Sequence, residues 1–186
     1  MIGPANGVRA RRTLPVLLLG LLFFGPLLIA FALYYGSDWR PAGHTNHGTL
    51  IQPPRALPGS EFVGKWSLVY VGPGDCDADC RRTLYFMRQT HLGLGSLATR
   101  VQRVFVVTAR CCDRAYLARE QAGLVTLNAA DATHTALLHT IPADGRATSV
   151  FIVDPRGNLM MRYDAGARPE GFLDDLKNLL ALSSIG

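Results

Sequence analysis

Four cysteines are the first candidates for chemistry in this chain. Cys76 and Cys80 are separated by three residues, and Cys111 directly precedes Cys112. Positions i and i+4 lie on one face of a helical turn, so the first two sulfurs can lie side by side. Two such thiolates suit a soft metal ion such as Cu(I), and they can equally close into a disulfide. A purely structural disulfide is the alternative, and the spacing alone does not decide between them.

The elements around the first pair place it where a strand turns into a helix. Residues 65–71, KWSLVYV, are rich in aromatic and β-branched side chains and predict a buried strand that ends at residues 72–74, Gly-Pro-Gly. Residues 81–94 predict a helix with one packed face. The apolar positions that indicate this face are Leu84, Phe86, Met87 and Leu92.

Charges next to the pair act in opposite directions on a thiolate. The positive end of a helix dipole favours the ionised sulfur, and Arg81 and Arg82 add positive charge. Asp75, Asp77 and Asp79 oppose the thiolate, although they would favour an incoming cation. The sequence leaves open which effect is larger.

The order of the remaining elements predicts the fold. A strand–helix–strand start joins parallel strands by a right-handed crossover, and a hairpin then adds antiparallel strands. This is an α/β, thioredoxin-like arrangement, with a central mixed sheet flanked by helices. The further elements expected are a strand at 101–108, a helix at 113–121, a short strand or loop at 124–127, a helix at 131–138, hairpin strands at 149–153 and 159–163, and a helix at 168–182.

An uncharged run of 22 residues, Leu14 to Tyr35, precedes this domain. At a rise of 1.5 Å per residue it is about 33 Å long, enough to cross a bilayer core. A cleaved signal peptide is the alternative, but its apolar region is about 7–15 residues long, and no small-residue cleavage site follows here. Arg9, Arg11 and Arg12 precede the run, so the positive-inside rule predicts a cytoplasmic N-terminus.

Four parts are therefore expected: a cytoplasmic N-terminus (1–13), a transmembrane helix (14–35), an extended tether (36–60) and the thioredoxin-like domain (61–186). We expect the chain to cross a bacterial inner membrane once, with the domain in the periplasm, where cysteines can be oxidised. Residues after 36 carry 16 basic and 14 acidic side chains, so most of the net charge of +5 lies before the anchor. A nearly neutral domain does not indicate nucleic-acid binding.

Several of these features together resemble the Sco family of membrane-anchored cytochrome c oxidase assembly proteins. The resemblance covers roughly residues 60–184. It rests on the single anchor, the strand KWSLVYVG, the C-x-x-x-C pair and the stretch FIVDPRGNLMMRY near the end. It implies a thioredoxin-like fold, copper bound by two cysteines and a histidine, and a role at the dinuclear copper site of an oxidase subunit. That role is either copper delivery or reduction of the site's thiols.

Two positions depart from what the resemblance implies. The family's histidine lies about eight residues before the turn aspartate, Asp154, and this position is Arg146, whose guanidinium is not a useful copper ligand. His139 and His134 lie seven and twelve residues before that position, and His139 is the candidate replacement. His44 and His47 on the expected tether are further possible donors. The cis-proline of thioredoxins would fall at Thr148, which disfavours a general disulfide oxidoreductase.

The second cysteine pair ends the strand predicted at 101–108. Carboxyl ends of parallel strands share one edge of a sheet, so Cys111 and Cys112 are expected near Cys76 and Cys80. Three interpretations remain open: one of them resolves a disulfide with the first pair, both act as extra copper ligands, or both are structural.

Three functions follow from these observations. The first is a periplasm-facing assembly factor that delivers copper to, or reduces, the dinuclear copper site of cytochrome c oxidase through Cys76 and Cys80. The second is an enzyme, a thiol–disulfide oxidoreductase of the cell envelope. The third is a redox-inert thioredoxin-like docking module.

Overall fold

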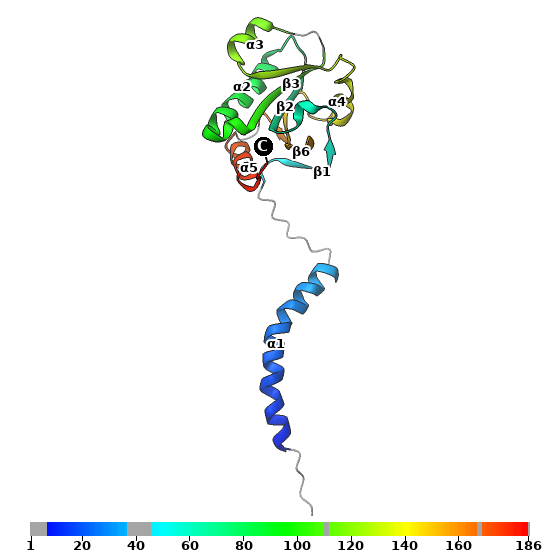
Figure 1. The fold of residues 1–186 in the computed structure, drawn as a ribbon, viewed down its shortest axis with the longest axis vertical. Helices are drawn as coiled ribbons and strands as arrows, with labels where there is room; N and C mark the ends of the chain where they lie inside the picture. The colour runs from blue at the N-terminus through cyan, green and yellow to red at the C-terminus, as the bar shows by residue number, and fades with distance from the viewer. Residues whose placement is uncertain (1–6, 37–45, 110–111, 167–168, 186) are drawn as a thin grey trace, which may run out of the picture. The chain divides into compact units, whose positions relative to one another are not determined.

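The structure is a computed structural model that describes residues 7–36, 46–109, 112–166 and 169–185 (Figure 1). The chain forms two compact units, Met1–His44 and Thr45–Gly186. The first contains one long helix, and the second contains a mixed sheet with helices on both faces. The expected thioredoxin-like architecture is thereby confirmed.

The first unit is the helix α1 (Gly7–Gly36). Its segment Leu14–Gly36, 23 residues long, is apolar and long enough to cross a membrane, and none of it is buried by protein. A helix that is apolar on all sides suits hydrocarbon surroundings better than water. By length and composition it is a transmembrane candidate, although a signal sequence shares these features.

The second unit is built on a six-stranded sheet in the order β1-β6-β5-β2-β3-β4. Strands β2, β3 and β4 are parallel, whereas β5, β6 and β1 add antiparallel partners beyond β2. All residues of the central strands β2 and β5 are buried, which explains their continuous apolar sequences. The strands are β1 (Thr49–Ala56), β2 (Trp66–Gly72), β3 (Val101–Val107), β4 (Leu124–Asn128), β5 (Ser149–Val153) and β6 (Asn158–Asp164).

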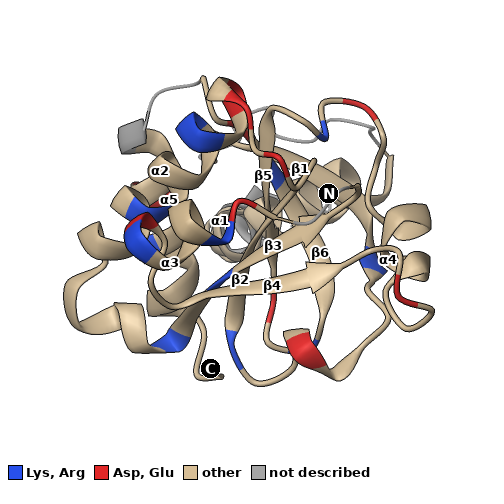
Figure 2. Cartoon of the chain, turned by 90° about the horizontal axis from the view of Figure 1, so that it is seen from above, with Lys and Arg blue, Asp and Glu red and all other residues tan. Residues whose placement is uncertain are grey.

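Side chains of the sheet alternate between two apolar cores. Leu68 and Tyr70 of β2 pack with α2, α3 and α5, whereas Val69 and Val71 pack with α4 and η1 on the opposite face. Figure 2 shows α2, α3 and α5 on one side of the sheet and α4 on the other. The helices are α2 (Ala78–Gly93), α3 (Arg114–Glu120), α4 (Thr135–Thr140) and α5 (Pro169–Leu182), with 3₁₀ turns η1 (Ser60–Phe62) and η2 (Gly95–Arg100).

Two local predictions differ from the structure. Leu92 is 59% exposed, because the buried stripe of α2 runs through Leu84 and Met87 to Thr90, and Leu92 lies off that stripe. The helix expected at 131–138 forms only over Thr135–Thr140, after a turn that begins at Asn128.

The compact unit also begins earlier than the expected boundary near Glu61. Residues of the expected tether form β1, an edge strand antiparallel to β6. Its register shifts between Leu50 and Arg55, where Pro53 and Pro54 lie and the Gln52–Pro53 bond is cis. Proline has no N–H to donate, so an edge strand with an irregular register is where a sheet tolerates it.

Candidate functional site

Cys76 and Cys80 form a disulfide at the turn from β2 into α2, the place predicted from the sequence. The S–S distance is 2.02 Å and the Cα atoms are 5.0 Å apart. Each residue is only 1% exposed, and both belong to the apolar core under α2. Neither is therefore paired in this structure with a cysteine of the β3–α3 loop.

Asp77 shapes the turn that carries the disulfide. It caps the N-terminus of α2, and its carboxylate accepts a hydrogen bond from the Cys80 amide at 2.9 Å. Cys76, directly before the cap, has a φ of 43°, a region that non-glycine residues seldom adopt. Because Asp77 already occupies an amide of the first turn, its carboxylate competes with a thiolate for the positive end of the helix.

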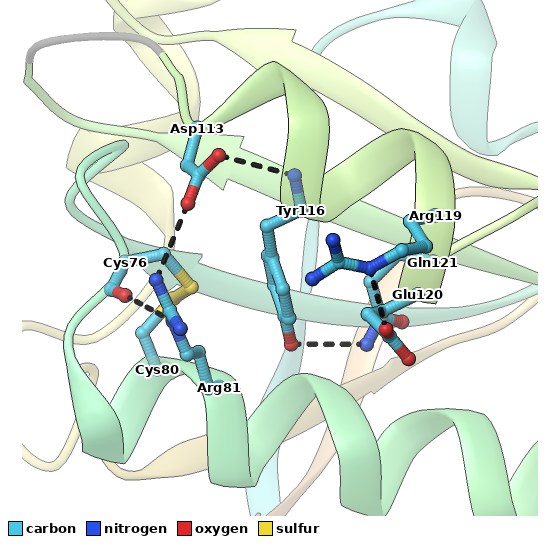
Figure 3. Close-up of polar contacts among 8 residues, drawn as sticks. All are labelled: Cys76, Cys80, Arg81, Asp113, Tyr116, Arg119, Glu120 and Gln121. Carbon is cyan, nitrogen blue, oxygen red and sulfur yellow. Dashed lines mark hydrogen bonds and ion pairs between the residues drawn. A yellow bond between two sulfur atoms is a disulfide. The ribbon is translucent and has the colours of Figure 1, made fainter.

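The β3–α3 loop lies beside this turn, as the parallel topology predicts. The Gly74 amide donates to the Ala109 carbonyl at 2.8 Å, and the Asp113 amide donates to the Gly74 carbonyl at 3.1 Å. Arg81 joins the two segments, because its Nε donates to the Cys76 carbonyl at 3.1 Å and its Nη2 to Asp113 Oδ2 at 3.2 Å (Figure 3).

Arg81 also stacks on the next helix. Its guanidinium carbon lies 4.8 Å from the ring centroid of Tyr116, and Asp113 caps α3 by accepting from the Tyr116 amide at 3.0 Å. The positive charge that the sequence places next to the cysteines is thus already paired. The sequence indicated Arg81 near the cysteines but not Asp113 or Tyr116. The signal for Asp113 is that it is the first residue of the helix expected at 113–121, where an aspartate commonly caps.

The second cysteine pair lies partly within the described residues. Cys112 is disulfide-bonded and partly buried, and it packs against the same apolar core as Cys76 and Cys80. Cys111 lies outside the described residues. Cys112 therefore lies near the Cys76–Cys80 disulfide, as the parallel topology predicts.

Arg146, at the position where the resemblance implies a histidine, has a structural use. Its Nε donates to the Pro142 carbonyl at 3.2 Å, and its Nη2 donates to the Leu138 carbonyl at 2.8 Å and to the Ile141 carbonyl. These carbonyls lie at the C-terminal end of α4 and just beyond it, where helical partners are missing. The guanidinium therefore caps α4.

The upstream histidines lie away from the disulfide. His139 is exposed on α4, which covers the face of the sheet opposite to the disulfide. His134 Nδ1 lies 3.2 Å from the Asn128 carbonyl, and its Nε2 lies 3.5 Å from Glu61. Within the described parts of the chain, no three His, Cys, Asp or Glu side chains form a group that could hold a metal ion. The ligand set of two cysteines and a histidine does not fit these residues.

Tyr70 lies on β2, the strand that leads into the disulfide turn, and its side chain packs in the core under α2. Its ring stacks on Phe105 with centroids 5.5 Å apart, and its hydroxyl donates to the Ala147 carbonyl at 3.1 Å. Burial, followed by the negative charges of Asp77 and Asp79, raises the pKa of Tyr70 to about 12. The phenol is thus neutral at physiological pH and holds the loop before β5 against the end of β2.

Replacing Tyr70 with phenylalanine should change how the stability depends on pH. A raised pKa stabilises the folded state below the unfolded-state value of about 10, and this contribution is lost as the pH rises through about 12. Tyr70→Phe should lower the free energy of unfolding by about 1 kcal/mol at pH 8. Between pH 9 and 11.5 the free energy of unfolding should fall less in this variant than in the unmodified protein. Chemical denaturation across this range measures both effects. Parallel pH profiles for the two proteins would contradict the assignment.

Gly72, the last residue of β2, leaves room for the Tyr70 side chain. A Cβ at this position would lie 2.6 Å from the Tyr70 hydroxyl oxygen and 2.8 Å from its Cζ. Because that ring is buried and stacked, Gly72→Ala should destabilise the domain by about 2 kcal/mol. Gly166→Ala is the matched control, since its Cβ would meet only Asp164 Oδ1, at 3.4 Å. Equal melting temperatures for the two variants would show that Tyr70 can move aside.

Known proteins share this thioredoxin-like architecture. A family model described as "Transmembrane-like, thioredoxin-like, C-terminal domain" matches residues 66–183. The chain belongs to this family. No curated protein matches it in sequence.

Solved structures of Sco proteins share the fold of this family member. Apo Sco1 from Thermus thermophilus has a TM-score of 0.58 at 20% identity, covering 74% of this chain and 99% of its own. Yeast Sco1 has a TM-score of 0.55 at 17% identity, covering 72% and 98%. Copper-bound ScoI from Bradyrhizobium japonicum has a TM-score of 0.51 at 19% identity, covering 69% and 98%. At these identities the likeness concerns the fold.

Proposed function

We propose that the protein is a membrane-anchored, periplasmic assembly factor that reduces a disulfide between the cysteines of the dinuclear copper site of cytochrome c oxidase to the two thiols. The observation that carries this proposal is the Cys76–Cys80 disulfide at the β2–α2 turn of a Sco-like fold, with Arg146 capping α4 where a third copper ligand is expected. A transmembrane α1 would keep the domain at high effective concentration near a membrane-embedded partner.

The reaction is a thiol–disulfide exchange in two steps. A thiolate of the reduced Cys76/Cys80 pair attacks one sulfur of the partner's disulfide, forming a mixed disulfide and releasing one partner thiolate. The second cysteine of the pair then attacks the mixed disulfide and releases the other thiolate. Two electrons and two protons pass to the partner, and the Cys76–Cys80 disulfide of this structure is the oxidised product. A dithiol donor of the cell envelope must reduce it again.

Burial of the disulfide favours a dedicated partner over a general oxidoreductase. Exchange needs an approach to a sulfur atom, and both cysteines are only 1% exposed. The turn is tied to the β3–α3 loop through Gly74 and Arg81. A partner that binds this turn and loosens its hydrogen bonds to Ala109 and Asp113 can reach the sulfurs, whereas an arbitrary thiol has no such binding energy.

Copper delivery is the second candidate for the same pair. After reduction, one soft sulfur donor lies just before the cap of α2 and the other in its first turn, with Cα atoms 5.0 Å apart in the oxidised form. Such a pair can hold Cu(I) as cargo with two protein ligands. This version needs no histidine from the chain.

One experiment with the full chain in detergent micelles separates these functions. The reduced protein is mixed with the oxidised, soluble copper-site domain of the oxidase subunit, and the thiols of both are counted by alkylation and mass spectrometry. We expect stoichiometric reduction of the partner and oxidation of Cys76 and Cys80, both absent in a Cys76→Ser/Cys80→Ser variant. No electron transfer would overturn the proposal.

A copper titration completes the test. Cu(I) is titrated against a competing chelator, with the same serine variant as the control. Stoichiometric binding that the variant loses would establish copper handling and select delivery over reduction if electron transfer is absent. If the serine variant still supports oxidase assembly in cells, the chain acts as a redox-inert docking module.

A further inference from the structure

A polar pocket lies between α2 and α3, next to the disulfide. Its volume is about 470 Å³, and Ala78 and Arg81 of the disulfide-bearing turn form part of its wall. Figure 3 shows Arg81, Tyr116 and Gln121 along the space between the two helices. Basic and aromatic side chains dominate the wall: Arg81, Arg82, Tyr85 and Arg88 from α2, and Tyr116 and Arg119 from α3.

The positive charge of this pocket is not fully compensated. Three of its arginines pair with a carboxylate of the same chain. Within the described residues, Arg88 has neither an ion pair nor a hydrogen bond, although it lies on the pocket wall. The pairs are Arg81 with Asp113 at 3.2 Å, Arg82 with Asp79 at 3.6 Å, and Arg119 with Glu120 at 2.9 Å.

A second unpaired guanidinium lies behind the pocket. Arg103 is 5% exposed and donates to Gln121 Oε1 at 2.9 Å and to the Ala122 carbonyl at 2.5 Å, so both described acceptors are neutral. Burial, and then the nearby charge of Arg88, lower the pKa of Arg103. Gln121 is itself 3% exposed and lines the pocket, and its amide donates to the Tyr116 hydroxyl at 3.2 Å. Arg88 therefore faces the pocket, and the buried Arg103 is hydrogen-bonded to the wall residue Gln121 behind it.

We propose that the α2–α3 pocket binds an acidic peptide segment of the protein partner and thereby brings the partner's cysteines to Cys76 and Cys80. Guanidinium groups bind carboxylates through paired, directional hydrogen bonds, and an incoming carboxylate would relieve the repulsion between Arg88 and Arg103. Binding of the acidic segment stands on the pocket alone, whereas delivery of cysteines rests on the proposed function.

The length of the basic wall favours a peptide over a small anion. Arg81 and Arg88 are seven residues apart on α2, or about 10 Å along the helix axis. An extended chain covers this distance with about three residues. A segment with two or three acidic side chains would therefore contact arginines along the wall while its end lies next to the disulfide.

The test uses the full chain in zwitterionic micelles and a fluorescent, cysteine-free peptide rich in Asp and Glu, with an Asn/Gln counterpart. Fluorescence anisotropy should show binding of the acidic peptide that weakens with salt. Arg88→Gln should weaken this binding about fivefold. Arg114→Gln, an exposed arginine of α3 that does not line the pocket, should change it less than about twofold. Circular dichroism confirms that both variants fold.

Several outcomes would overturn the docking site. These are equal binding of the Asn/Gln peptide, equal losses in Arg88→Gln and Arg114→Gln, or competition by inorganic phosphate as strong as that by the acidic peptide, which would indicate a small-anion site. The Cys76→Ser/Cys80→Ser variant should bind the peptide unchanged. Binding without electron transfer to the oxidase domain would refute the proposed function alone, and electron transfer to acidic and neutral cysteine peptides at equal rates would refute the docking site alone.

Discussion

Serine in place of Cys76 or Cys80, one at a time, is expected to stop electron transfer at a mixed disulfide with the partner. The remaining thiolate can still attack the partner's disulfide, but no second sulfur is present to resolve the product. Turnover should fall to background, and the covalent complex should accumulate. Non-reducing electrophoresis of the full chain with the oxidised copper-site domain measures both.

The amount of mixed disulfide that each serine variant accumulates then identifies the cysteine that attacks the partner. If Cys80→Ser traps more complex than Cys76→Ser, Cys76 attacks first. The Asp77 carboxylate accepts a hydrogen bond from the Cys80 amide, and its negative charge next to Cys80 disfavours a thiolate there. This supports Cys76 as the attacking residue. Cys112→Ser is the matched control and should keep turnover. If it stops turnover instead, Cys112 of the β3–α3 loop takes part in resolving the disulfide, as one interpretation of the sequence holds.

The sequence was informative where burial dictates residue type. Strands β2, β3 and β5 are central and buried, so apolar runs marked them within about one residue of their observed ends. Strand β1 was missed because its pairing depends on β6, more than a hundred residues away, and not on its own composition. Two prolines within β1 made the local signal point to a tether.

The site was predictable only as far as local spacing reaches. The C-x-x-x-C spacing and the strand before it placed Cys76 and Cys80 correctly. The partner of Arg81 is 32 residues away, and the carbonyls that Arg146 caps become neighbours only when α4 forms. A list of charges therefore indicated which groups are near the cysteines, but not which of them are already neutralised.

Replacing Asp175 with alanine is expected to destabilise the domain strongly. Its carboxylate is 5% exposed and accepts hydrogen bonds from the His47 amide at 2.7 Å, the Gly48 amide at 3.3 Å and the Tyr163 hydroxyl. His47 Nδ1 lies 3.1 Å from the other carboxylate oxygen. The substitution leaves these donors without their acceptor, at a cost of about 3 kcal/mol. Thermal unfolding of the full chain in micelles should show a melting temperature lower by about 10 °C.

Asp174→Ala is the control for this prediction, because the neighbouring carboxylate is exposed and its loss should change stability by less than about 0.5 kcal/mol. Asp175→Asn should fall between the two, since an amide keeps one acceptor oxygen but turns its NH₂ group toward other donors. If both aspartate-to-alanine variants unfold alike, the hydrogen bonds of the buried Asp175 carboxylate do not stabilise the domain. A large loss in Asp175→Ala alone would show that the buried carboxylate, which joins α5 to Tyr163 of β6 and to the amides of His47 and Gly48, stabilises the compact unit.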